Sequence, residues 1–208
     1  PDVIVGMKIA HYALADWRDV DRALDAARKL GMPLMVDFGN LAGPRNLRSL
    51  LVDKLRPGDI YTHCYSGWRT ELVNRKVNPA ILEARRRGVV FDLGHGAGSF
   101  FWWVAVPAFE QGFLPDSIST DLHTGSMNAG MKDMVNVMSK VLNLGVPIEE
   151  VIRMSTWNPA REIKRPLLGN LDDGAEADIT VLSLDHGRFG YLDSDGARRG
   201  GDRNLTTE

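Results

Sequence analysis

The feature that most constrains the fold is an alternation of strand-like and helix-like segments that repeats five times. Apolar runs rich in β-branched residues, each followed by a longer segment of helical character, lie at Val3–Ile9, Pro33–Phe38, Asp59–Cys64, Val89–Leu93 and Ser117–Leu122. Apolar runs without strict alternation are typical of parallel strands that helices cover on both faces. The sequence therefore predicts an α/β fold built on a parallel sheet.

Several of the intervening segments carry helix boundary signals. The predicted spans are Asp16–Gly31, Asn78–Gly88 and Asn128–Gly145, each with a capping residue at its start and a glycine at its end. In STWNPAREI, Asn158 as N-cap and Pro159 as first helical residue predict a further helix start.

One metal-competent or basic residue stands at the C-terminal end of each predicted strand. These residues are Lys8, Asp37, His63, His95 and Asp121. They follow one another at intervals of about 30 residues, the size of one βα unit. A closed barrel gathers polar groups from many strands at one rim, whereas an open doubly wound sheet binds ligands at one switch point. The register favours a (β/α)8 barrel.

Composition narrows the class of partner. The chain has 25 basic and 27 acidic side chains, so no net field favours nucleic acid or an anionic membrane, and we expect a small-molecule substrate. Cys64 is the single cysteine, so a metal would be held by nitrogen and oxygen ligands, and a reducing, cytoplasmic location is expected. The chain begins at Pro1 and enters an apolar run directly, which predicts further upstream sequence and leaves an export signal open.

Six strings in the sequence resemble the amidohydrolase superfamily, in the deacetylase-like branch beside dihydroorotases. They are VGMK, LRPGDIYTHCYSG, GVVFDLGHGAGSFFW, GFLPDSISTDLH, STWNPAREI and GNLDDGAEADITVL. The resemblance implies a TIM barrel of the metallo-dependent hydrolase type, of which about the last five βα units are present. Residues 1–165 would form this part, and residues 166–208 would return to a small β-domain and end in a tail. From Asp185 onward we expect loop or disorder, with short strands around Phe189–Leu192.

The resemblance also implies a metal site at the barrel mouth. Lys8 matches a carboxylated lysine whose CO2-derived carbamate bridges two divalent ions, His63 a histidine ligand, and Asp121 an aspartate that binds metal and acts as general acid and base. Asp37 departs from the pattern, because the commoner residue there is histidine. A carboxylate can replace imidazole on zinc but favours harder ions such as manganese. The HxH motif of the family does not occur in this chain.

Four further residues are predicted to contact the substrate. His95 lies between two glycines, and His123 follows Asp121 by two positions, which places both side chains on the same side of a strand. Tyr65 and Ser66, with Trp68, lie on the loop after His63, where specificity residues of barrels belong. A structural role for His95 is an equal alternative.

The function that the resemblance implies is hydrolysis of an amide or ester bond of a small molecule, with metal-activated water attacking the carbonyl. A deacetylase-like activity is the first expectation, and cleavage of a cyclic amide, as in dihydroorotases, is the second. A Schiff-base aldolase using Lys8 is a rival class, but it leaves Asp37, His63 and Asp121 without a role. A non-catalytic binding or scaffold protein is the other rival. Five strands cannot close an eight-stranded barrel, so open edges favour a homo-oligomer.

Overall fold

The computed structural model describes residues 3–12, 14–37, 41 and 43–208. The strands are β1 (Met7–Ala10), β2 (Leu34–Asp37), β3 (Ile60–Tyr61), β4 (Leu72–Val73), β5 (Lys76–Val77), β6 (Val90–Phe91), β7 (Leu182–Leu192) and β8 (Arg198–Thr207). The helices are α1 (Arg18–Lys29), the π-helix η1 (Ser49–Lys54), α2 (Pro79–Arg86), α3 (Trp102–Glu110), α4 (Thr124–Met127), α5 (Met134–Leu142), α6 (Ile148–Ser155) and α7 (Trp157–Glu162).

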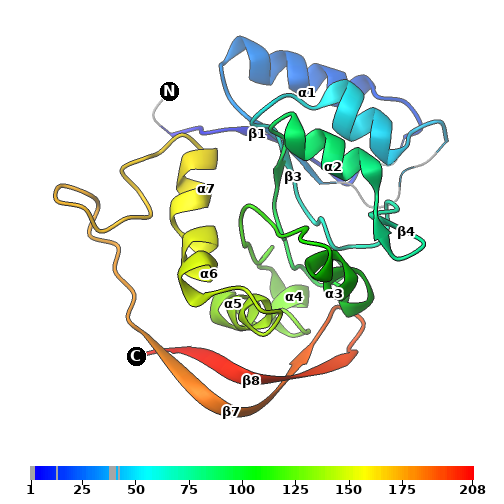
Figure 1. Ribbon diagram of the computed structural model, residues 1–208. Helices are drawn as coiled ribbons and strands as arrows, with labels where there is room; N and C mark the ends of the chain where they lie inside the picture. Colours follow the sequence, from blue (N-terminus) through cyan, green and yellow to red (C-terminus); the bar gives the residue numbers. More distant parts are fainter. Residues whose placement is uncertain (1–2, 13, 38–40, 42) are drawn as a thin grey trace.

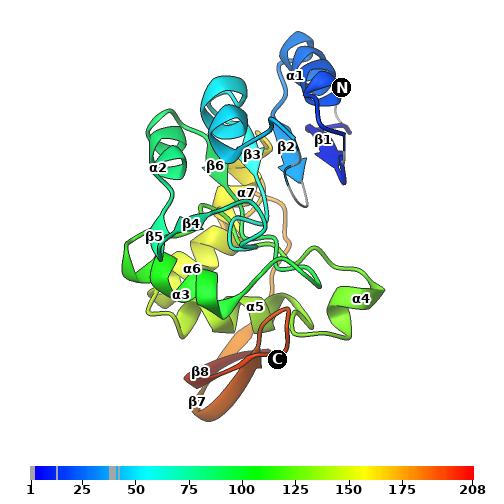
Figure 2. The same ribbon diagram turned by 90° about the vertical axis from the view of Figure 1, so that its right-hand side faces the viewer.

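A four-stranded parallel sheet organises the first half of the chain. Its order is β1-β2-β3-β6, so strands adjacent in the sheet follow one another along the chain, apart from the small antiparallel pair of β4 and β5. The helices α1, η1 and α2 lie along one side of this sheet (Figure 1, Figure 2). This arrangement confirms the predicted α/β class with a parallel sheet, whose second predicted strand ends in Phe38, outside the described residues.

The fifth predicted strand, Ser117–Leu122, is not a regular strand, since only Ser117 forms a β-bridge and Asp121 has a left-handed backbone. A parallel bridge pairs Asp92 with Ser117, and the Leu93 and His95 amides donate to the carbonyls of Ser117 and Ser119 at 3.0 and 3.1 Å. The segment therefore runs beside the chain that follows β6. Because it continues the order of the sheet, it delivers Asp121 to the same rim as the ends of the preceding strands.

The predicted helix boundaries are confirmed for α2 and, to within one residue, for α1, whereas the predicted start of α5 is wrong by several residues. In α2, the Asn78 side chain accepts from the Ala80 amide at 2.9 Å, as an N-cap does. The helix α1 begins at Arg18, one residue later than an N-cap at Asp16 predicts, and the Asp16 carboxylate accepts from the Arg18 amide at 3.1 Å and from the Arg18 side chain at 2.6 Å. The cap of α5 is Asp133, which accepts from the Asn136 amide at 2.8 Å.

The predicted N-cap at Asn158 is also wrong. The helix α7 begins at Trp157, so Asn158 lies within it. Its side-chain amide donates to the Asp116 carbonyl at 2.7 Å. This tertiary contact gives the Asn158 side chain a partner other than the helix N-terminus.

The C-terminal segment forms a long antiparallel hairpin, so the expectation of loop or disorder from Asp185 onward is wrong, whereas the strand expected around Phe189–Leu192 is confirmed as part of β7. The strands β7 and β8 pair along most of their length and lie against α5 at the bottom of the molecule in Figure 1. Tyr191 and Leu205 are buried in this contact region. A boundary at residue 165 between the barrel part and the small β-domain stays a proposal. Within the described ranges, no helix is both long and apolar enough to cross a membrane.

Candidate metal centre

A cavity of about 230 Å³ lies where the parallel strands end. It is lined by His11, Asp37, His63, Trp68, Ala97, Gly98, Ser99, Asp121 and His123. Five of these residues were singled out from the sequence, Asp37, His63, Asp121 and His123 as metal or substrate residues and Trp68 as a specificity residue. The rim predicted from the strand-end register therefore has a counterpart in the folded chain.

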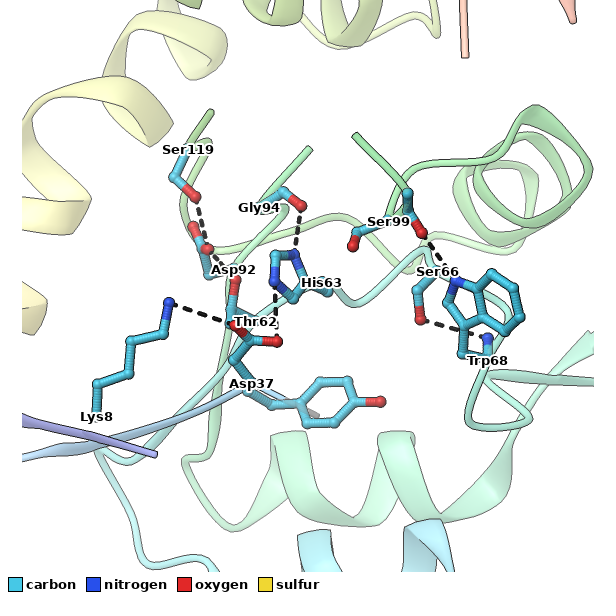
Figure 3. A network of polar contacts seen from close by, with 12 residues as sticks. Lys8, Asp37, Thr62, His63, Ser66, Trp68, Asp92, Gly94, Ser99 and Ser119 are labelled. Carbon is cyan, nitrogen blue, oxygen red and sulfur yellow. Dashed lines mark hydrogen bonds and ion pairs between the residues drawn. The ribbon is translucent and has the colours of Figure 1, made fainter. Parts of the chain in front are cut away.

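Asp37, at the end of β2, is the centre of a polar network (Figure 3). Its Oδ1 lies 3.1 Å from Nε2 of His63, and its Oδ2 lies 3.5 Å from Nζ of Lys8. Burial raises the pKa of Asp37, but the hydrogen bond and charge of His63, with the charges of Lys8 and Arg69, bring that pKa down to about 2. Asp37 is therefore an anionic carboxylate at neutral pH.

The imidazole of His63 is oriented by the chain that follows β6. Its Nδ1 lies 2.6 Å from the Gly94 carbonyl oxygen, to which it can only donate, and this leaves Nε2 facing the carboxylate of Asp37 (Figure 3). A lone pair and a carboxylate at 3.1 Å repel each other unless a positive charge lies between them. Either a second proton on the ring or a shared cation supplies it.

The donor set fits a divalent ion. Two donors that each bind one ion at about 2.0 to 2.2 Å have a separation near that of Asp37 Oδ1 and His63 Nε2. Among the described residues, no three His, Cys, Asp or Glu side chains gather closely enough to hold an ion by themselves. Asp37 and His63 are therefore the two candidate donors in contact with each other, and Nζ of Lys8 forms an ion pair with Asp37 at 3.5 Å without lining the cavity.

Three pocket residues share an unusual backbone conformation. His11, His63 and Asp121 have φ angles of 53°, 60° and 49°, in the left-handed region that side chains with a Cβ disfavour. Such strain concentrates at functional sites, where the surrounding structure holds it in place. Sequence reasoning missed His11, although its position directly after β1 placed it at the same rim as the other strand-end residues.

The two glycines around His95 permit a close approach to the candidate ligands. A Cβ on Gly94 would lie 2.3 Å from the Thr62 hydroxyl and 2.7 Å from Nδ1 of His63. A Cβ on Gly96 would lie 2.8 Å from Oδ2 of Asp121. The Gly94–Gly96 loop thus forms the support on which both His63 and Asp121 rest.

Asp92 connects the segments that carry the candidate ligands through hydrogen bonds. Its carboxylate accepts hydrogen bonds from the hydroxyls of Thr62 and Ser119 at 2.5 and 2.7 Å (Figure 3). It also accepts one from the Ser117 hydroxyl at 2.9 Å. These donors belong to the segments that end at His63 and Asp121. Asp92 therefore fixes the lateral spacing between the two candidate ligands.

Three of the predicted substrate residues do not line the cavity. Tyr65 is buried in an aromatic cluster and donates to the Phe113 carbonyl at 3.0 Å, and Ser66 donates to buried Glu71 at 2.8 Å. His95 is also fully buried and turns away from the cavity, which fits the structural alternative left open for it.

Trp68, by contrast, is half exposed at the cavity, and its indole nitrogen donates to the Gly98 carbonyl at 2.8 Å. His123 is exposed and caps α4 by accepting from the Gly125 amide at 3.1 Å through Nδ1. Its Nε2 is left as the atom available to a ligand.

Comparison with known proteins identifies the family. The model of the amidohydrolase family matches residues 105–205. A protein of Brucella anthropi named a deacetylase is 37% identical over 199 residues, covering 93% of this chain and 49% of that protein. A deacetylase of Agrobacterium fabrum is 36% identical, covering 93% and 48% respectively. The chain belongs to the amidohydrolase superfamily.

Solved structures show how this amidohydrolase chain relates to the complete fold. It superposes over its full length on 58% of an adenine deaminase with a TM-score of 0.91 and 29% identity. It superposes equally on 55% of a dihydroorotase with a TM-score of 0.86 and 33% identity. The predicted TIM-barrel class is confirmed, and the chain spans about half the length of the amidohydrolases that it matches.

Proposed function

We propose that this chain carries part of the active site of a metal-dependent hydrolase that cleaves an amide or ester bond of a small molecule, in a deacetylase-like reaction. The observation that supports it most is the 3.1 Å approach of Asp37 Oδ1 and His63 Nε2 in a cavity that Asp121 also lines. The names of the curated relatives support the deacetylase assignment.

The proposed metal ligands are Lys8, Asp37, His63 and Asp121. As an ammonium, Lys8 cannot bind a cation, so it would act as a carbamate formed with CO2, which presents anionic oxygen instead. One or two ions would be held, with zinc favoured by the histidine and manganese made acceptable by the carboxylate of Asp37.

A divalent ion held here would polarise the substrate carbonyl and activate a water molecule. Asp121 would accept the proton of the attacking water and pass it to the leaving nitrogen or oxygen atom. The bond between His63 and the Gly94 carbonyl would keep Nε2 aimed at the ion, and partners of this kind raise metal affinity in metalloenzymes.

Substrate contacts are assigned to the exposed residues at the cavity, His11, Trp68 and His123. The Trp68 ring offers an apolar face, whereas the two histidines offer hydrogen bonds. An acylated small molecule that is partly apolar and partly polar matches this set of contacts.

A second candidate is hydrolysis of a cyclic amide. The structural similarity to a dihydroorotase at 33% identity supports it, and the same ligands and the same proton transfer would serve. The two reactions differ in whether the leaving group stays attached to the product, so parallel assays with N-acetylated compounds and with dihydroorotate separate them.

The test is metal analysis of the full-length protein together with the variant Asp121→Asn. We expect one or two equivalents of zinc or manganese, and a loss of at least about 100-fold in hydrolysis of the best substrate, because one proton-transfer group contributes about that much or more. The variant Asp173→Asn, at an exposed aspartate outside the cavity, is the matched control. A protein that is metal-free, or an Asp121→Asn variant with full turnover, contradicts the proposal.

A further inference from the structure

A buried lysine and a buried histidine contact each other behind the candidate metal centre. Nζ of Lys140, in α5, lies 2.7 Å from Nε2 of His95 and 2.5 Å from the Gly130 carbonyl oxygen. Both side chains are fully buried. Burying an amine and an imidazole costs free energy unless they are hydrogen-bonded, and the proposed chemistry uses neither residue directly.

The contact defines the state of the His95 ring. Its Nδ1 lies 2.9 Å from the Gly96 carbonyl oxygen and donates to it, so Nε2 must accept from Lys140. Burial and the charge of Lys140 lower the pKa of His95 to about 3, which keeps the ring neutral. Phe100 stacks on the ring at a centroid distance of 4.8 Å. The imidazole is therefore held in one tautomer and one orientation.

The backbone around His95 supports the candidate ligands directly. The Gly94 carbonyl accepts from His63, and Gly96 packs against Oδ2 of Asp121. Hydrogen bonds run without interruption from Lys140 through His95 to the backbone of Gly96. A displacement of this loop would move His63 and Asp121 together.

We propose that Lys140 is a positioning residue, which through His95 holds the Gly94–Gly96 loop in place beneath His63 and Asp121. The effect on metal binding rests on the proposed function, whereas the restraint of the loop does not.

The hairpin turn fastens the segment that follows this loop. The Ser194 hydroxyl accepts from the Ser99 and Phe100 amides at 3.2 and 3.1 Å, and the Ser194 amide donates to the Phe100 carbonyl at 2.9 Å. The Asp193 carbonyl oxygen lies where a Cβ of Gly130 would be. The hairpin turn therefore packs closely against Gly130, whose carbonyl accepts from Lys140. Lys140 thus contacts the loop through His95, and the hairpin holds the chain that follows the loop.

The substitution Lys140→Met separates positioning from general stabilisation. Methionine keeps the length and the apolar stem but removes the amine, whose burial is itself unfavourable. A lysine that only filled the core would leave the loop unchanged when replaced in this way. If Lys140 positions the loop, its replacement by methionine should loosen the loop while the global stability is retained.

The experiment compares hydrogen exchange of the metal-free, full-length protein and its Lys140→Met variant by mass spectrometry. Peptides that contain Gly94–Gly96 should exchange about tenfold faster in the variant, while peptides from β2 and β3 and the thermal midpoint stay unchanged. The variant Lys76→Met, at an exposed lysine of β5, is the control. Unchanged exchange across the loop overturns the proposal, as does acceleration spread over the whole chain.

Chelator competition for zinc then tests the consequence for the metal centre. Affinity should fall by about 10- to 100-fold in Lys140→Met, the range seen when partners of metal ligands are removed. His95→Phe, which retains a ring against Phe100, should reproduce the loss, and the double variant should be no weaker than either single one. If the unaltered protein binds no metal, the proposed function fails, while the exchange experiment still decides the role of Lys140.

Discussion

Nε2 of His63 faces Oδ1 of Asp37 at 3.1 Å, while the opposite nitrogen of the same ring is committed to the Gly94 carbonyl. This pairing joins the ends of β2 and of the segment after β3. A neutral ring oriented in this way cannot donate to Asp37, so the contact calls for a positive charge. Either a second proton on the ring, which makes an ion pair with Asp37, or the metal ion proposed here supplies that charge.

Replacing Asp37 by histidine should change the metal preference. An imidazole is a softer donor than a carboxylate, so Asp37→His should shift binding toward zinc over manganese by about tenfold. The measurement is the metal content after dialysis against equal concentrations of both ions. Asp37→Asn, which removes the charge without adding an imidazole, should bind both ions more weakly. Equal zinc-to-manganese ratios in the parent and Asp37→His would contradict the ligand role of Asp37.

Replacing His11 by glycine should stabilise the protein and weaken its activity. Glycine accepts a φ of 53° without strain, so His11→Gly should gain about 1 kcal/mol of folding free energy. The lost imidazole should raise KM more than it lowers kcat, if His11 contacts substrate. Asn74→Gly is the matched control, since Asn74 has a φ of 50° in an exposed turn outside the cavity and should gain stability with unaltered kinetics.

Gly96→Ala should damage the site beyond the cost of backbone strain. The new Cβ would lie 2.8 Å from Oδ2 of Asp121 and would displace that carboxylate, in addition to straining a backbone with φ of 54°. We expect a loss of about 1 to 3 kcal/mol of stability and a fall in kcat. Gly145→Ala, where φ is 97° and no atom lies within 4 Å of the added carbon, should show the strain without the fall in kcat. If kcat were the same in Gly96→Ala and Gly145→Ala, the added Cβ of residue 96 would not displace the Asp121 carboxylate from its working position.

Glu162 should make stability fall with rising pH. Burial first, and then the charge of Asp92, raise the pKa of this carboxyl to about 8, and its Oε1 has no hydrogen-bond partner among the described residues. Between the ordinary glutamate pKa and pH 8 the folded state keeps a proton that the unfolded state has released. The stability associated with that proton is therefore complete at low pH and lost as the pH rises toward 8.

The variant Glu162→Gln should remove this dependence. It should match the parent near pH 5 and exceed it by about 1 to 3 kcal/mol at pH 8, measured by urea denaturation. Glu149→Gln, at an exposed position, should leave the pH profile unchanged. A parent protein whose stability is flat from pH 5 to 8 would argue against a protonated Glu162.

The sequence by itself determined the class of the fold and most of the rim. Continuous apolar runs indicate strands that are covered on both faces, as in a parallel sheet. A spacing near one βα unit then places Asp37, His63 and Asp121 at the same ends of those strands. Asn78 specified its helix start because the capping bond is made with residues two positions away. The resemblance, carried by long strings, led to the family that comparison then confirmed.

Only the tertiary structure decided which polar residues face the cavity. His95 and Ser66 were equal candidates in the sequence, but Lys140 and Glu71 engage them from remote or neighbouring parts of the fold and turn them inward. His11 lines the cavity because its backbone adopts a left-handed conformation, which no local sequence pattern predicts. Such orientations depend on contacts between residues far apart in the chain, and their energies are absent from any local window of sequence. The register of strands is a local and periodic property, whereas the direction of a single side chain is decided by its neighbours in space.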